Sequence, residues 1–124
     1  MKPHTKIIDL IQNVLSPDLI GRTWQKQTKE RPLSGYCYIA SEAFYYLEAK
    51  ELGYKPAQMW VHVGNGTEIS HWFLRRQSDG DIVDITAAQF GKIRIPYHQA
   101  RSCGFLTNFP SDGAAEIMRR IEES

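Results

Sequence analysis

The chain has 124 residues, of which 42% are hydrophobic and 23% charged, with 15 Lys and Arg against 14 Asp and Glu. A chain of this length buries enough surface for a core without a metal or disulfide, so we expect a single domain over residues 1–124. The near-neutral charge lacks the strong basic field that nucleic-acid binding uses, and no stretch of about 18 apolar residues predicts a membrane span. We therefore expect neither nucleic acid nor membrane as a partner.

Cysteine usage points to a reducing compartment. Cys37 and Cys103 are the two cysteines, too few for the disulfide framework of a small secreted domain. The first apolar stretch is interrupted by Asp9 and Asn13, so it does not form a signal-peptide core. We expect a cytoplasmic protein in which both thiols are reduced.

The first predicted element is an amphipathic helix over residues 5–15, where apolar residues recur at helical spacing. Ser16-Pro17 ends this helix, since the residue before a proline avoids helical geometry. Residues 16–35 hold prolines, glycines and many polar side chains, and predict a long connection with a short helix around 19–26. Whether this connection covers a site as a lid is left open by the sequence.

A second helix is predicted to begin near Ser34-Gly35 and to end at Gly53, its expected C-terminal cap. Its buried stripe is expected to comprise Ala40, Ala43, Phe44 and Leu47. Cys37 then falls in the first turn of this helix.

Strands follow. Met59, Val61 and Val63 alternate with Trp60 and His62, which is the period of a strand. Asn65-Gly66 is a strong hairpin signal, and the returning strand is expected over 67–75. A third strand is predicted over 81–85. Beyond it we expect a helical turn over 87–90 capped by Thr86, and an edge strand over 93–97.

Ser111 is predicted to cap a last helix, in which Ala114, Ile117, Met118 and Ile121 share one face. The order of elements predicts an α+β fold. In it, N-terminal helices, one with the cysteine at its N-terminus, pack on a small antiparallel sheet, and a helix ends the chain.

Cys37 is expected where a nucleophile is favoured. Unpaired backbone N–H groups and aligned peptide dipoles at a helix N-terminus stabilise a thiolate, and they can also stabilise an oxyanion on a substrate. A free cysteine is more often a small buried hydrophobe. The chemical interpretation therefore needs a base and a group that orients the base.

Such a pair is predicted on neighbouring strands. If the loop between the second and third strands covers residues 76–79, His71 lies directly opposite Asp84, with Cβ atoms about 5 Å apart. A tight turn on Asp79-Gly80 would instead place His71 opposite Ala88, on the same face but four residues from Asp84.

His62 is the alternative base. With Asn65-Gly66 at the hairpin turn, Trp60 is expected opposite His71 and His62 opposite Ile69, so that all four share a face. His71 is preferred because it alone has a carboxylate as a cross-strand neighbour. A histidine on such a face is otherwise a structural residue with its hydrogen bonds satisfied.

The segments around these residues resemble a known superfamily. They are GYCYIASEA over 35–43, SHWFL over 70–74 and DITAAQF over 84–90. Their Cys, His, Asp order and spacing are similar to those of transglutaminase-like and papain-like cysteine enzymes. Together with CGFLT over 103–107, they more narrowly resemble a group of small proteins common in tailed bacteriophages.

The resemblance implies a catalytic triad that acts on an amide or isopeptide carbonyl without a cofactor or a metal. Cys37 would be the nucleophile, His71 the general base and acid, and Asp84 the residue that orients His71. The triad does not choose among protease, isopeptidase, deamidase and transglutaminase. The implied partner is a protein or peptide substrate, which would be a host protein during infection if the phage likeness holds. Full-length transglutaminases and arylamine acetyltransferases carry additional domains, and the sequence shows nothing that would hold acetyl-coenzyme A in the usual way.

Substrate binding is expected to involve aromatic and amide side chains near the triad. They are Trp24, Gln27, Tyr36, Tyr38, Trp60, Trp72 and Gln89. The oxyanion hole would be backbone alone or would use Gln27 or Trp24, and core packing is the ordinary role of the aromatic residues. Arg101-Ser102-Cys103-Gly104 is a cationic stretch able to contact an anionic group, with a solvated loop as the simpler interpretation.

Two other functions stay open. A non-enzymatic, phage-encoded binding or inhibitor module could use the same fold. A metal site built from Cys37, Cys103 and the four histidines lacks close ligand spacing such as Cys-x-x-Cys. The substrate, the acyl acceptor and the oligomeric state are not predicted.

Overall fold

The α+β fold is confirmed by the structure, a computed structural model that describes residues 5–20, 36–64 and 66–123. The described elements are, in chain order, α1 (Thr5–Val14), the 3₁₀ turn η1 (Pro17–Leu19), α3 (Cys37–Phe44), its π-helical continuation η2 (Tyr45–Ala49), β1 (Tyr54–Gly64), β2 (Thr67–Arg76), β3 (Ile82–Val83), the 3₁₀ turns η3 (Ala87–Phe90) and η4 (Tyr97–Gln99), β4 (Arg101–Ser102) and α4 (Asp112–Glu123). The four strands form one sheet in the order β3-β2-β1-β4, and every neighbouring pair is antiparallel. Within these described ranges, no helix is long and apolar enough to cross a membrane.

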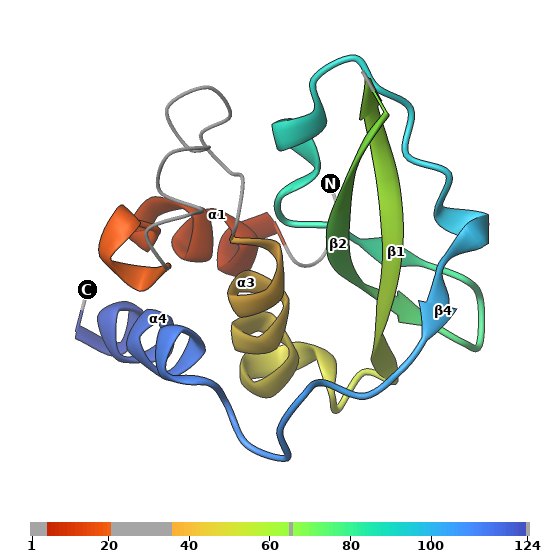
Figure 1. The fold of residues 1–124 in the computed structure, drawn as a ribbon. Helices are drawn as coiled ribbons and strands as arrows, with labels where there is room; N and C mark the ends of the chain where they lie inside the picture. Colours follow the sequence, from red (N-terminus) through yellow and green to blue (C-terminus); the bar gives the residue numbers. More distant parts are fainter. Residues whose placement is uncertain (1–4, 21–35, 65, 124) are drawn as a thin grey trace.

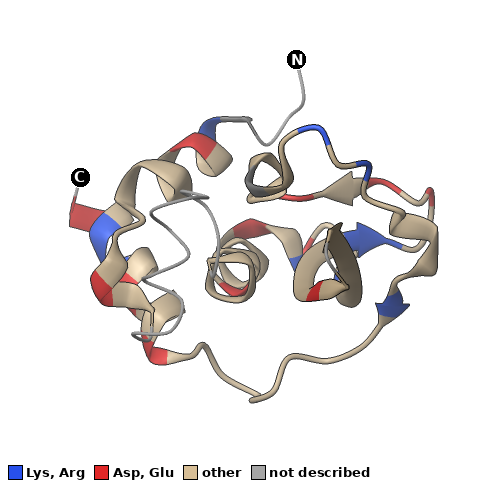
Figure 2. Cartoon of the chain, turned by 45° about the horizontal axis from the view of Figure 1, so that its top comes forward, with Lys and Arg blue, Asp and Glu red and all other residues tan. Residues whose placement is uncertain are grey.

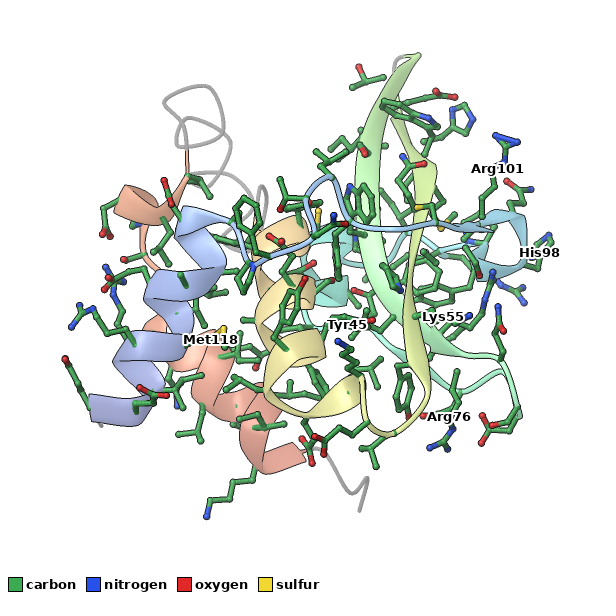
Figure 3. All side chains as sticks on the ribbon, turned by 90° about the horizontal axis from the view of Figure 1, so that it is seen from below. Tyr45, Lys55, Arg76, His98, Arg101 and Met118 are labelled. Atoms are coloured by element: carbon green, nitrogen blue, oxygen red, sulfur yellow. The ribbon has the colours of Figure 1, made fainter. Side chains whose placement is uncertain are left out.

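Helix α3 occupies the centre of the molecule, between the sheet and the two outer helices α1 and α4 (Figure 1). One hydrophobic core joins α3 to α1, α4 and the near face of the sheet, and contains Ile11, Phe44, Leu74 and Ile117 among its buried members. A second core covers the opposite face of the sheet under residues 86–100. In Figure 3, Met118 marks the outer helical side, and His98 and Arg101 mark the far edge of the sheet.

The predicted stripe of the second helix is only partly right. Ala40, Ala43 and Phe44 are fully buried, whereas Leu47 is half-buried and Ala49 is buried in its place. The cause is the π-helical turn, in which the N–H of Lys50 donates to the carbonyl of Tyr45, five residues back, at 2.9 Å. Each π turn adds one residue to the helical period and rotates the following side chains.

The ends of the first two predicted helices agree with the structure where it describes them. The first helix ends at Val14, before Ser16-Pro17, and α3 begins at Cys37 itself. Gly53, the predicted cap, adopts a φ of 86°, and its N–H donates to the carbonyl of Lys50 at 3.3 Å. The proposed start at Ser34-Gly35 and most of the short helix around 19–26 lie outside the described residues; within that range the structure shows η1, which ends at Leu19.

The predicted register of the first hairpin is wrong by one residue over most of its length. Met59, not Trp60, is opposite His71, and His62 is opposite Glu68. The predicted pairing holds only at Gly64 and Thr67, because a β-bulge lies between His62 and Gly64. A shift of one residue moves a strand's side chains to the other face, so Trp60 and His62 point away from the face that carries His71.

The second hairpin is displaced by two residues from its prediction, which preserves the face. Leu74 pairs with Val83 and Arg75 with Ile82, so the loop comprises residues 77–80 rather than 76–79. In this register Asp84 comes after the end of β3, diagonal to His71 and on the same side of the sheet. The predicted strand over 81–85 is reduced to Ile82–Val83.

The predicted edge strand over 93–97 is not formed. That segment is irregular and ends in η4, while the edge strand β4 forms at Arg101–Ser102, opposite Ala57 and Gln58. Ile93 and Ile95 pack against the second core without pairing to a strand. The turn at Ala87–Phe90 is confirmed as η3, although the side chain of Thr86 makes no capping hydrogen bond.

The C-terminal helix is tied to α3 by a buried carboxylate. Glu42 is fully buried and accepts hydrogen bonds from the Ser111 hydroxyl at 2.5 Å and from the Ser111 N–H at 3.2 Å. The hydroxyl of Ser111 in turn accepts a bond from the N–H of Ala114 at 3.4 Å, as predicted for the cap of α4. Burial raises the pKa of Glu42, and the Ser111 bonds offset only part of this rise.

Glu42→Gln is expected to stabilise the protein increasingly as pH rises. Because folding raises the pKa of Glu42 above its ordinary value of 4.5, the wild type loses stability from that pH upward, and the neutral amide avoids this loss. Urea unfolding at about pH 5 and about pH 8 measures the difference. The exposed Glu122→Gln is the control, and a Glu42→Gln effect that does not grow with pH would contradict the prediction.

Gly113→Ala is expected to destabilise the protein although alanine favours helices. A Cβ on Gly113 would lie 2.9 Å from Cγ2 of Ile39 and 3.2 Å from the backbone oxygen of Leu19. Overpacking costs about 1–3 kcal/mol, against a helix-propensity gain of at most about 1 kcal/mol. Thermal unfolding should show a lower midpoint for Gly113→Ala and little change for Gly104→Ala, whose added Cβ meets no atom within 4 Å.

Candidate active site

The N-terminal half of α3 is attached to a free edge of β2. Strand β3 pairs only with Leu74 and Arg75, so the preceding residues of β2 present carbonyl groups to α3. The thiol of Cys37 donates to the carbonyl of Ser70 at 3.7 Å, and the hydroxyl of Ser41 donates to the carbonyl of Trp72 at 3.2 Å. Cys37 and Ser41 are four residues apart, a rise of about 6 Å along a helix, and Ser70 and Trp72 are two residues apart, about 6.8 Å along a strand. The spacing of the two donors on α3 therefore matches the spacing of the two carbonyls on β2.

His71 follows Ser70 and turns its side chain to the opposite face of the sheet. It is fully buried, with the ring of Phe90 edge-on at 4.8 Å and the ring of Phe73 stacked at 6.1 Å. Its Nε2 lies 2.6 Å from Oδ2 of Asp84, whose side chain is 4% exposed. The diagonal placement therefore joins the predicted base to its predicted orienting carboxylate.

Burial and the contacts with Asp84 and Cys37 have opposite effects on the pKa of His71. Burial alone would lower the pKa of the imidazole, but the hydrogen bond to Asp84 and the side-chain contact with Cys37 outweigh it and raise the pKa to about 9. Burial disfavours the charged imidazolium, whereas the contacts with Asp84 and Cys37 stabilise it. At neutral pH His71 is therefore an imidazolium paired with the Asp84 carboxylate.

The second ring nitrogen of His71 is available for chemistry. Nδ1 is buried and has no hydrogen-bond partner in the described part of the chain. The Cys37 thiol donates to Ser70 instead of to this nitrogen.

Cys37 is the first residue of α3. The N–H groups of the first helical turn have no partner within a helix, and their dipoles favour negative charge at this position. Among the described residues, the Ala40 N–H is the first of the helix that bonds back, to the carbonyl of Tyr36 at 2.9 Å. This arrangement can stabilise both a thiolate and an oxyanion formed next to it.

Tyr97 belongs to the site and was not predicted. Its hydroxyl donates to Oδ2 of Asp84 at 2.8 Å, the same oxygen that holds His71, and its ring meets Phe73 edge-on at 5.0 Å. Burial and the neighbouring Asp84 carboxylate raise the pKa of Tyr97. The residue lies 13 positions beyond Asp84, in η4, where the sequence carries no periodic signal. Its hydroxyl, next to Pro96 within the predicted edge strand over 93–97, is the one feature of the sequence that points to it.

The predicted substrate-binding residues separate into several places. Tyr38 and Trp72 meet edge to face at 4.9 Å beside α3, and Trp60 is 56% exposed at the end of the same sheet face. Tyr36 is buried in the helical core. Trp24, Gln27 and the side chain of Gln89 lie outside the described residues.

The described residues do not place His62 near Asp84 and do not form a metal site. His62 is exposed and pairs with Glu68 at 2.9 Å, on the side of the sheet away from His71. Both cysteines are free thiols, Cys37 buried and Cys103 exposed. In the described ranges no three His, Cys, Asp or Glu side chains come together as metal ligands would.

Comparison of the chain with protein-family models, curated proteins and solved structures finds no match. The resemblance noted from the sequence therefore stays a hypothesis, and the site must be judged on its own geometry.

Asp84→Asn is expected to lower the pKa of His71 well below about 9, because the carboxylate that raises it is lost while the burial that lowers it remains. NMR titration of the imidazole ¹⁵N resonances measures this shift. Asp79→Asn is the matched control, since Asp79 pairs with Arg76 and not with the site. A His71 midpoint that is the same in the wild type and in Asp84→Asn would contradict the assignment.

Proposed function

We propose that the protein performs cysteine-dependent acyl chemistry on an amide or isopeptide carbonyl, with Cys37 as nucleophile, His71 as general base and acid, and Asp84 as the residue that orients His71. The observation that supports this most is the fully buried His71, held through Nε2 by Asp84 while Nδ1 stays free on the side of a helix-terminal cysteine. A histidine buried for structure alone would have both nitrogens satisfied.

The reaction follows from these positions. The Cys37 thiolate attacks the carbonyl carbon and forms a C–S bond, and the resulting oxyanion is stabilised by N–H groups of the first turn of α3. Nδ1–H of His71 protonates the leaving nitrogen as the C–N bond breaks. The neutral imidazole then removes a proton from water or an amine, which attacks the thioester and releases the thiolate. Asp84 keeps the proton on Nε2 throughout.

A binding module is the second candidate function, and one observation favours it. Cys37 is only 7% exposed, as expected for a cysteine that packs as a small hydrophobe.

Alkylation of Cys37 by iodoacetamide separates the two functions. In a Cys103→Ser background we expect a pH-independent rate down to about pH 6, because the His71 imidazolium stabilises the thiolate. Asp84→Asn and His71→Gln should slow the reaction about tenfold or more at that pH. A rate that rises only near pH 8.5, as for a free thiol, or no reaction in the folded protein, favours the binding module.

A substrate screen completes the test. Peptide amides and isopeptides with a reporter amine are incubated with wild type and with Cys37→Ser, and the thioester is trapped with hydroxylamine. We expect turnover and trapping that are lost in Cys37→Ser. The exposed Arg119→Gln, far from the site on α4, is the control that keeps both.

A further inference from the structure

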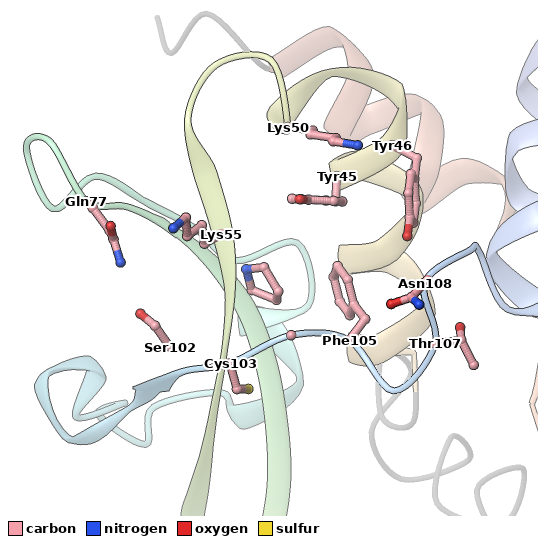
Figure 4. A pocket seen from close by; sticks show the side chains of 12 residues that line it. Tyr45, Tyr46, Lys50, Lys55, Gln77, Ser102, Cys103, Phe105, Thr107 and Asn108 are labelled. Carbon is pink, nitrogen blue, oxygen red and sulfur yellow. The ribbon is translucent and has the colours of Figure 1, made fainter.

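A second site lies at the other end of the central helix. A pocket of about 570 Å³, here called the lysine pocket, opens between η2, the start of β1 and the segment after β4 (Figure 4). It is lined by Tyr45, Tyr46, Lys50, Lys55, Pro56, Gln77, Ser102, Cys103, Gly104, Phe105, Thr107 and Asn108. Its volume falls within the range of small-molecule sites. None of the triad residues lines it, and its use does not rest on the proposed acyl chemistry.

The charge of the lysine pocket has one sign. Lys50 and Lys55 are its ionised lining residues, and neither Asp nor Glu lines it. Both lysines are exposed, and neither forms a salt bridge with another described residue. Along the chain, by contrast, basic and acidic residues are interspersed (Figure 2). Two uncompensated ammonium groups beside one hollow favour an anionic ligand.

The two sides of the lysine pocket differ in chemistry. Tyr45, Tyr46 and Phe105 gather on one side, where Lys50 and Asn108 also lie, and Lys55, Gln77 and Ser102 stand on the other (Figure 4). The aromatic rings are already packed edge to face, with Tyr45 5.2 Å from Tyr46 and 5.4 Å from Phe105. A flat aromatic group can extend this cluster by stacking, while the polar side contacts an anionic group.

The aromatic side of the lysine pocket is built on the π-helical turn η2. Tyr45 and Tyr46, its first two residues, are both half-buried and line the pocket, and Lys50 follows the last residue of the turn. Such π turns are rare in proteins, and those that occur are often found at functional sites.

We propose that the lysine pocket binds a small organic anion that carries one aromatic ring, a phosphate ester or carboxylate of nucleotide size or less. The aromatic side contacts the ring, and Lys50 and Lys55 neutralise the anion. Gln77, Ser102 and Asn108 supply hydrogen bonds that orient it. The cationic stretch predicted around Arg101 thus contributes to an anion site through its neighbours Ser102 to Gly104 rather than through the arginine itself, which does not line the pocket.

Cys103 provides a local readout because it lines the lysine pocket and is exposed. In a Cys37→Ser background, modification of Cys103 by N-ethylmaleimide is followed by mass spectrometry with phenyl phosphate, inorganic phosphate or phenol present. Amide chemical shifts of residues 102–108 report binding independently. We expect phenyl phosphate to protect Cys103 with millimolar affinity, and inorganic phosphate and phenol to bind more weakly.

Charge and stacking are tested by matched variants. Lys50→Gln combined with Lys55→Gln should weaken phenyl phosphate about tenfold and leave phenol unchanged. Tyr46→Leu should weaken phenyl phosphate and phenol together. Lys92→Gln, an exposed lysine outside the pocket, is the control. The proposal is overturned if phenyl phosphate neither protects Cys103 nor shifts these amides, if the double lysine variant binds it as the wild type does, or if phenol binds equally well.

Discussion

The attachment of α3 to the free edge of β2 is the constraint on which the rest of the structure depends. With its thiol protonated, Cys37 donates to the carbonyl of Ser70, and Ser41 donates to the carbonyl of Trp72, on the part of the β2 edge that β3 does not pair with. The same two bonds fix the rotation and the height of the helix. Because β3 is only two residues long, the edge next to His71 stays open for the first turn of α3. A longer β3 would pair with this edge and displace the cysteine.

The buried ion pair beside this edge is costly, and the fold compensates it locally. Removing His71 and Asp84 from water carries a desolvation cost. The contact between the two side chains at 2.6 Å and the hydrogen bond from the Tyr97 hydroxyl to Asp84 offset this cost. Two polar atoms, Nδ1 of His71 and Oδ1 of Asp84, are still without a partner among the described residues. A core selected for stability alone would replace such a pair with apolar side chains. Its presence is therefore the strongest argument that the site has a chemical task.

The sequence predicted the elements better than their contacts. Helical spacing and the cap at Ser111 depend on local interactions, and the described helix ends agree with them. Register depends on single residues in loops. The bulge before Gly64, whose φ of 105° suits glycine, moved Trp60 and His62 to the other face and removed the alternative base. The pairing of His71 with Asp84 survived a wrong loop because an error of two residues conserves the face. Tyr97 was missed because a 3₁₀ turn in an irregular segment leaves no period to detect.

The two ends of the central helix offer opposite electrostatic conditions. At Cys37 the backbone itself favours an anion, so the cysteine needs only one base nearby. At the end of η2 the helix dipole disfavours an anion, and any anionic ligand in the lysine pocket would have to be held by side chains. Lys50 stabilises the helix end when the pocket is empty and would be shared with a bound anion. Ligand binding there would therefore weaken the interaction of Lys50 with the helix end, which argues for modest affinity and for Lys55, on β1, as the stronger anchor.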